Sequence, residues 1–169
     1  MKGLGAIDLV VAVTGEDGQG HFREMPSPQH YGMPETGEVV FAWSTDATPN
    51  LDDDIGGPAA DTGFPPPGAS KFGLVFVPPH ATGAWDAAHS PDAMHASATI
   101  DYEVVISGKI DIILDSGERR TLTPGSCLVM AGANHAWSNP YDEPCVYAAI
   151  ILGAQSDKEF KPFFGNDPG

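Results

Sequence analysis

The chain has 169 residues, 41% of them hydrophobic, and carries 23 acidic against 8 basic residues, for a net charge of −15. This length suits one folded domain with a sizeable core. The negative charge excludes nucleic acids and anionic membranes as favoured partners, because both repel an acidic protein. No apolar run is long enough to span a bilayer, and residues 1–13 lack a secretory cleavage pattern, so we expect a cytoplasmic protein.

Residues 1–70 predict a few N-terminal strands followed by a long loop. A β-rich run at residues 7–13 precedes a Gly- and Asp-rich turn, which indicates a hairpin returning through residues 21–23, and residues 38–44 predict another strand. Residues 45–70 are rich in Asp, Gly and Pro and fit no regular element. Such a loop is either a functional lid or surface wrap, or a mobile acidic insertion.

Residues 71–152 predict the core of an all-β domain. Short strand-like runs are separated by Gly, Pro and Asn turn formers, a pattern typical of a sandwich or barrel. The runs cover residues 71–77, 99–107, 109–114, 119–122, 127–130 and 145–152. In the tail, residues 153–169, we expect Phe160, Phe163 and Phe164 to pack on the barrel or on a neighbouring subunit. We therefore expect one domain over residues 1–169.

Side chains alternate clearly in the run at residues 99–107. Asp101 and Glu103 share one side, whereas the other side is apolar and comprises Ile100, Tyr102, Val104 and Ile106. Two carboxyl groups would be costly in a dry core, so their side is expected to face a partly wet, ligand-sized interior. The apolar side must then be covered from outside, and a homodimer contact would cover it.

Two spaced sets of residues resemble the two motifs of the cupin superfamily. The first set is His95, Ser97, Asp101 and Gly108, and the second is Gly125, Gly132, His135 and Asn139. Ser97 stands where the family motif has a second His, Asp101 replaces a Glu, and the proline of the second motif is missing. The resemblance covers roughly residues 71–152. It implies a double-stranded β-helix, or jelly-roll barrel, with a site inside it.

The resemblance also implies a ligand set for a metal ion. His95, Asp101 and His135 would hold a divalent transition metal, such as Fe, Mn, Zn or Ni, with open positions for a substrate. Ser97 is a poor ligand, so the alternative is a metal-free site that works by acid and base chemistry, as in related sugar epimerases. Asp101 and Glu103 lie side by side and would raise each other's pKa, which suits proton transfer.

The catalytic candidates are therefore Asp101, Glu103 and His135. Ser97, Tyr102 and Trp137 are candidates for contacting a small-molecule substrate, although aromatic strand residues are more often part of a core. His80 and His89 are weaker candidates at the pocket mouth. We expect an enzyme with a lyase-type reaction, namely dehydration, decarboxylation or isomerisation. The alternatives are a metal-dependent dioxygenase and a non-catalytic binding barrel.

Overall fold

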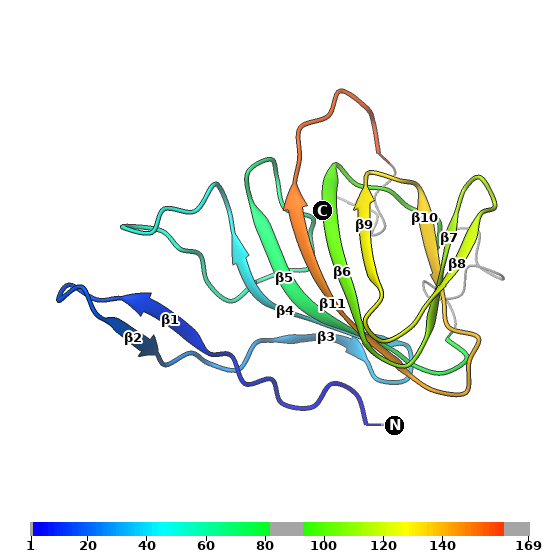
Figure 1. The fold of residues 1–169 in the computed structure, drawn as a ribbon, viewed down its shortest axis with the longest axis horizontal. Coiled ribbons are helices and arrows are strands. Elements are labelled where there is room, and N and C mark those ends of the chain that lie inside the picture. The colour runs from blue at the N-terminus through cyan, green and yellow to red at the C-terminus, as the bar shows by residue number, and fades with distance from the viewer. Residues whose placement is uncertain (1, 82–92, 161–169) are drawn as a thin grey trace, which may run out of the picture.

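The computed structural model describes residues 2–81 and 93–160, and its regular elements are almost all β-strands (Figure 1). Six antiparallel strands form the main sheet in the spatial order β3 (His30–Met33), β4 (Gly37–Thr45), β5 (Ser70–Val77), β11 (Cys145–Gly153), β6 (Thr99–Ser107) and β9 (Cys127–Ala131). Three more form a small sheet in the order β10 (His135–Ser138), β7 (Ile110–Leu114) and β8 (Arg119–Leu122). A separate hairpin joins β1 (Val11–Thr14) and β2 (Gly20–Arg23).

The hydrophobic core lies between the main and small sheets. Ile110 and Ile112 of β7 pack in one cluster with main-sheet side chains such as Val75, Val105 and Tyr147. In β11, alternate residues from Cys145 onward are buried, because successive side chains of a strand point to opposite faces of the sheet. Two facing antiparallel sheets of this order confirm the expected all-β jelly-roll barrel.

One glycine allows the chain to pass from the main sheet to the small sheet. Gly108 connects β6 to β7 with φ of +73°, and a Cβ atom at this position would lie 2.0 Å from the carbonyl oxygen of Pro144. Both the positive φ and the close approach exclude a side chain there. The glycine thus allows β6 and β7 to lie on different walls of the same barrel.

The strands of the expected barrel core are confirmed to within about two residues, and so is the N-terminal hairpin, although β1 begins at Val11 rather than residue 7. Two short strands, β3 and β10, were not predicted. Each has four residues and contains a histidine, so neither presents a run of β-branched residues long enough to stand out. Their strand geometry comes from pairing with β4 and β7, respectively.

The Pro- and Gly-rich loop between β4 and β5 is held against the barrel. Its backbone pairs with β4 through Ser44 and Gly57, with N–O distances of 2.7 and 3.0 Å. Trp43 Nε1 donates a hydrogen bond to the Ile55 carbonyl at 2.9 Å. Lys71 Nζ donates to the Asp61 carbonyl at 3.1 Å and forms an ion pair with the Asp61 carboxylate. These contacts favour a surface wrap over a mobile insertion.

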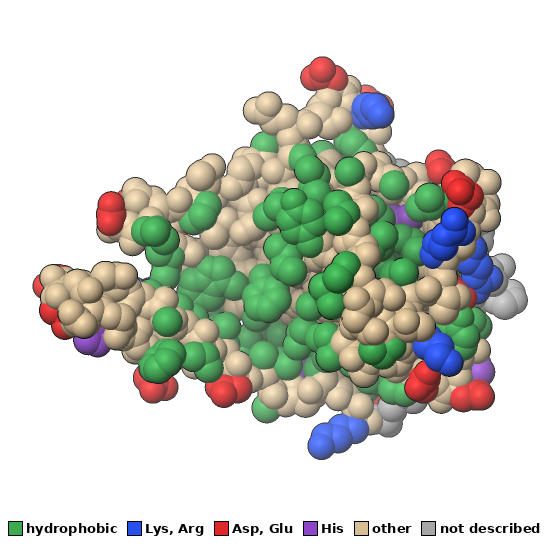
Figure 2. All heavy atoms as spheres, in the orientation of Figure 1, with side chains coloured by type: hydrophobic (Ala, Val, Ile, Leu, Met, Phe, Trp, Pro, Cys, Tyr) green, Lys and Arg blue, Asp and Glu red, His purple; other side chains and the backbone are tan. Residues whose placement is uncertain are grey.

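The outer face of the main sheet is apolar, and nothing in residues 2–81 and 93–160 covers it. Hydrophobic side chains gather over the middle of this face (Figure 2). Its exposed members are Phe72, Tyr102, Val104, Ile106 and Val129. The β1–β2 hairpin projects away from the two sheets (Figure 1) and carries Phe22, which is 81% exposed.

The tail contacts the barrel through Phe160, since a Cβ atom on Gly132 would lie 3.1 Å from the Phe160 ring. Phe163 and Phe164 lie outside the described residues. Within the ranges described, no helix has the length and apolar character that a membrane crossing requires.

Candidate functional site

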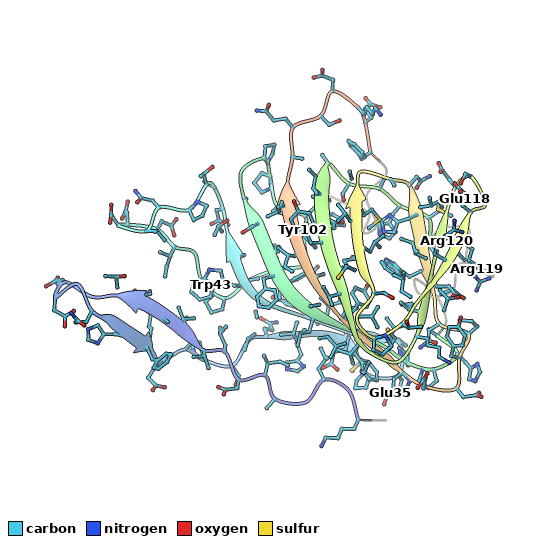
Figure 3. The ribbon with its side chains drawn as sticks, in the orientation of Figure 1. Glu35, Trp43, Tyr102, Glu118, Arg119 and Arg120 are labelled. Carbon is cyan, nitrogen blue, oxygen red and sulfur yellow. The ribbon has the colours of Figure 1, made fainter. Side chains whose placement is uncertain are left out.

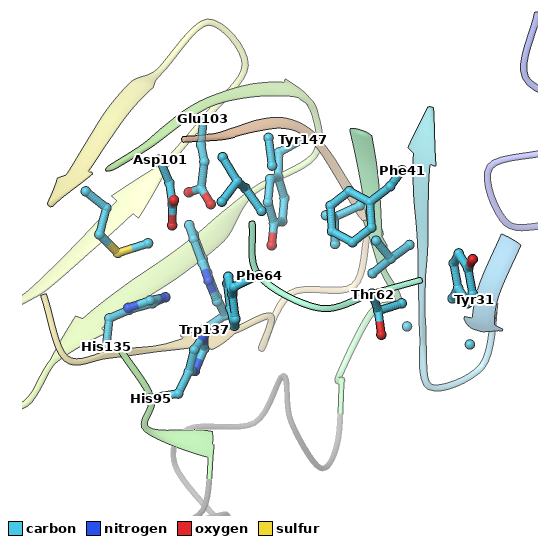
Figure 4. Close-up of a pocket in the computed structure, with 17 residues that line it drawn as sticks. Tyr31, Phe41, Thr62, Phe64, His95, Asp101, Glu103, His135, Trp137 and Tyr147 are labelled. Atoms are coloured by element: carbon cyan, nitrogen blue, oxygen red, sulfur yellow. The ribbon is translucent and has the colours of Figure 1, made fainter. Parts of the chain in front are cut away.

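A cavity of about 350 Å³ opens between the inner face of the main sheet, strand β10 and the loop between β4 and β5 (Figure 4). Its volume is near the lower end of the range of small-molecule pockets, roughly 300–1,000 Å³. His95, Asp101, Glu103 and His135 lie at one end, and Phe41, Thr62 and Tyr31 lie at the other. The cavity therefore has a polar end and a mainly apolar end.

Two histidines come together because their backbones pair directly. The His95 amide donates to the His135 carbonyl at 2.8 Å, and the His135 amide donates back to the His95 carbonyl at 2.9 Å. The two imidazole ring centroids are 4.3 Å apart. In both rings Nδ1 contacts a backbone carbonyl, of Ala93 at 2.9 Å and of Ala133 at 2.8 Å. A carbonyl only accepts hydrogen bonds, so Nδ1 carries the proton and Nε2 carries the lone pair.

The two carboxyl groups of β6 enter the cavity from the opposite wall (Figure 4). Asp101 and Glu103 are only 6% and 8% exposed, as the alternation in this strand predicts. Asp101 Oδ1 and Glu103 Oε2 are buried and have no hydrogen-bond partner among the described residues. An unsatisfied buried polar atom costs about 1–3 kcal/mol. Both residues line the cavity, so these two oxygens are the candidate contact point for a ligand with hydrogen-bonding groups.

Burial, and then the charge of Asp101, raise the pKa of Glu103 from 4.5 to about 8. Burial also raises the pKa of Asp101 from 3.8 to about 6, against the opposing effect of a hydrogen bond from Thr99. Because the two groups are neighbours, they titrate as a pair. Between about pH 6 and pH 8 the pair holds one proton, so it can both accept and donate a proton.

The imidazoles are neutral near pH 7. Burial, together with the neighbouring His95, lowers the pKa of His135 to about 4. Burial also lowers the pKa of His95, with the hydrogen bond to Ala93 acting in the opposite direction. Two neutral rings with Nε2 lone pairs act as hydrogen-bond acceptors at the polar end of the cavity.

Aromatic side chains form the middle of the cavity wall. Trp137 stacks on Tyr147 with ring centroids 5.1 Å apart and an interplanar angle of 23°, and His135 meets Trp137 edge-on at 6.1 Å. Burial raises the pKa of Tyr147 well above 10, so its phenol stays protonated. Trp137 therefore lies in the cavity wall, where the sequence predicted a substrate contact.

The expected metal triad is not assembled. In residues 2–81 and 93–160, no three His, Cys, Asp or Glu side chains converge closely enough to hold one metal ion. His95 and His135 adjoin each other, but Asp101 projects from the opposite wall of the cavity (Figure 4). The described donors therefore do not fit a metal held by His95, Asp101 and His135.

Two predicted substrate contacts and one weaker candidate lie elsewhere. Tyr102 is 43% exposed on the outer face of β6 (Figure 3), because it alternates with the inward-facing Asp101 and Glu103. Ser97 is buried outside the cavity, with its hydroxyl 2.6 Å from that of Thr99. His80 is exposed and pairs with Asp142 at 2.8 Å. His89 lies outside the described residues.

Several cavity residues were not predicted because they come from the N-terminal part of the chain. Thr62 and Phe64 reach the cavity from the long loop, Phe41 from β4 and Tyr31 from β3. No spacing in the sequence links them to the histidines. Asn139, by contrast, fixes the turn after β10 as its position suggests. Its amide donates to the carbonyls of Val77, Pro78 and Glu143 at 3.3, 3.0 and 3.0 Å.

Several curated proteins are similar to part of this chain. A phomopsin biosynthesis cluster protein of Diaporthe leptostromiformis is 41% identical over 73 residues, which are 43% of this chain and 34% of that protein. A cupin-domain-containing oxidoreductase of Hypocrea virens is 41% identical over 46 residues, or 27% of this chain and 24% of that protein. The matches thus span about a third or less of these relatives. No family profile matches the chain.

Two solved structures superpose on about half of the chain. The Cupin_2 domain of a transcriptional regulator from Enterobacter cloacae is 26% identical, covers 51% of this chain and 83% of its own, and has a TM-score of 0.40. The DMSP lyase DddQ of Ruegeria pomeroyi is 16% identical, covers 55% and 42%, and has a TM-score of 0.42. The jelly-roll barrel, the two spaced motifs and the sequence matches to cupin-domain-containing proteins together support the assignment of this chain to the cupin superfamily.

Proposed function

We propose that this cupin is a small-molecule enzyme that catalyses a proton-transfer reaction of the lyase or isomerase type, such as dehydration, decarboxylation or isomerisation. The observation that carries the proposal is the pair of buried, unpartnered carboxyl oxygens, Asp101 Oδ1 and Glu103 Oε2, at the polar end of the cavity. A fold gains nothing from two such groups, whereas proton transfer needs a base and an acid held near each other.

Dehydration of a β-hydroxy carbonyl compound shows how Asp101 would act as the base and Glu103 as the acid. Asp101, the more acidic partner, takes the proton from the carbon next to the carbonyl. A carbon–carbon double bond forms as the bond to the hydroxyl oxygen breaks, and Glu103 gives its proton to that oxygen, which leaves as water. The proton on Asp101 then passes back to Glu103, and the pair regains its starting state. Isomerisation uses the same two transfers without loss of water.

The remaining polar groups orient the substrate. The Nε2 atom of His135 accepts a hydrogen bond from a substrate hydroxyl, because its Nδ1 proton is held by the Ala133 carbonyl. Trp137 and Phe64 exclude water from the carboxyl pair, which strengthens every electrostatic contact inside the cavity. The aromatic wall thus supports the raised carboxyl pKa values that the reaction requires.

A neutral β-hydroxy ketone, 4-hydroxy-4-phenylbutan-2-one, tests the proposal. We expect the protein in D₂O to exchange the protons between the carbonyl and hydroxyl carbons, seen by NMR, and to form the conjugated enone, seen by absorbance. Glu103→Gln should lower both rates by about 10²–10⁴-fold. The exposed Glu118→Gln is the matched control and should leave them unchanged. Product formation that requires dioxygen and persists in Glu103→Gln would contradict proton transfer.

A second candidate is an oxidoreductase, which the names of several relatives favour. Metal content after purification without chelator distinguishes it from the first. The proton-transfer proposal expects less than about a tenth of an equivalent of transition metal. A stoichiometric metal that is lost in His135→Ala would favour a metal-dependent oxygenase instead. Ligand binding with neither exchange nor oxidation would point to a non-catalytic binding barrel.

A further inference from the structure

The described residues that line the cavity include no Lys or Arg with which to bind an anion. The chain has eight Lys and Arg residues, and none of them lines the cavity among the described residues. Lys71, although buried along its stem, is engaged with Asp61 outside the cavity. Of the residues outside the described ranges, 82–92 include no Lys or Arg in their sequence, and 161–169 include Lys161. Carboxylate and phosphate ligands are normally recognised by such residues, so the described lining of this cavity lacks the side chains that usually bind them.

The polar end of the cavity would repel an anion. Asp101 and Glu103 are both buried there, and each has an oxygen with no hydrogen-bond partner. An anionic ligand group would share a poorly solvated space with these carboxyls, where like charges repel more strongly than in water. A neutral hydroxyl or carbonyl, in contrast, donates to or accepts from the same oxygens. The polar head of the ligand is therefore not an anion.

The rest of the cavity suits a flat apolar body. Trp137 and Tyr147 present stacked rings, and Phe64 lies beside them at the centre of the cavity (Figure 4). Phe41 and Tyr31 extend this lining toward the end away from the carboxyl pair. Aromatic rings gain from offset stacking on such walls. The arrangement therefore matches a molecule with one polar end and an aromatic or similarly flat body.

We infer that the substrate of this site is an aromatic or similarly flat carbonyl or hydroxyl compound without a negative charge. Carboxylates and phosphate esters are excluded, which leaves dehydration or isomerisation, rather than decarboxylation, as the proposed reaction. That the bound molecule is also turned over rests on the proposed function, whereas the selectivity is a property of binding alone. The polar head of the ligand lies against Asp101 and Glu103, and its flat body lies along Trp137 and Phe64.

Two probes of nearly equal size, one mainly neutral and one anionic at pH 7, test this selectivity. We expect 4-hydroxyacetophenone to bind in titration calorimetry at pH 7, and 4-hydroxybenzoate to bind at least 100-fold more weakly. Asp101→Asn should reduce this ratio by about tenfold or more, because it removes the charge beside the ligand head. Asp46→Asn, an exposed change of the same kind, should leave the ratio unaltered. Phe64→Ala should weaken the ketone about tenfold.

The inference is overturned if the carboxylate binds as well as the ketone, or if the ketone shows no binding at its solubility limit. Both results come from the wild-type protein, so they hold even if a variant fails to fold. Selective ketone binding without proton exchange would leave the inference standing and refute the proposed reaction. Proton exchange on a carboxylate substrate would support the proposed reaction and refute the inferred selectivity. The two failures are therefore distinguishable.

Discussion

The raised pKa of Glu103 makes the stability of the fold depend on pH in a defined direction. Burial and the neighbouring Asp101 raise this pKa from 4.5 to about 8. The native state therefore favours the protonated form, so below about pH 4.5 the ionisation of Glu103 does not lower the unfolding free energy. As pH rises from there, the unfolded chain loses the proton first, and the native state is progressively destabilised until the folded carboxyl ionises near pH 8.

The size of this effect follows from the shift. A difference of about 3.5 pKa units, at 1.36 kcal/mol per unit, corresponds to about 5 kcal/mol above pH 8. Glutamine has nearly the same shape as a protonated glutamate but does not ionise. The unfolding free energy of Glu103→Gln minus that of the wild type should thus be constant below pH 4.5 and rise by up to about 5 kcal/mol by pH 9.

Urea unfolding followed by tryptophan fluorescence at pH 5, 7 and 9 measures this difference. Subtracting the two proteins at each pH cancels the contribution of the imidazoles, whose lowered pKa values act in the opposite direction by destabilising the fold at acid pH. Glu118→Gln is exposed and should give a flat difference. A flat difference for Glu103→Gln as well would refute the reasoning, because it would mean that this carboxyl ionises as freely in the fold as in water.

Three further predictions concern the carboxyl pair, the turn after β10 and the outer face. If the proposed function holds, kcat/KM should follow a bell-shaped pH profile with limbs near pH 6 and pH 8; a profile flat from pH 5 to pH 9 would contradict this. Asn139→Ala leaves three carbonyls without their donor and should cost about 3 kcal/mol. This lowers Tm by roughly 6–12 °C in a thermal melt, and an unchanged Tm would argue against its structural role. We also propose that the apolar outer face, including Val129 at 66% exposure, forms a homodimer contact. Light scattering after size exclusion should find a dimer that Val129→Lys converts to monomer and Leu51→Lys does not, whereas a monomeric wild type would oppose the contact.

The barrel was predictable because its signals are local. Short strands alternate with Gly and Pro turns through most of residues 71–152, and each strand takes its periodicity from neighbouring side chains. The same alternation predicted that Asp101 and Glu103 face inward and that Val104 and Ile106 face outward, as observed. β3 and β10 escaped prediction because four residues carry too little periodic signal, and their strand geometry depends on the partner strand.

The contents of the cavity were only partly predictable. His135 and Trp137 could be assigned to it because they follow a motif in order along the chain. Phe64 could not, because it belongs to a loop without periodicity that reaches the cavity through contacts such as that of Lys71 with Asp61. Tyr102 was assigned to it wrongly, although its own alternation with Asp101 already places it outside.

By itself, the sequence determined the class of fold and the inward face of β6, because both depend on the period of a strand. The spacing of the two motifs also placed both imidazoles in one barrel. Only the tertiary structure decided whether those groups meet. His95 and His135 adjoin through direct backbone pairing, whereas the carboxyl pair stands across the cavity. Such separations depend on how far apart two sheets pack, a distance set by side chains from the whole chain.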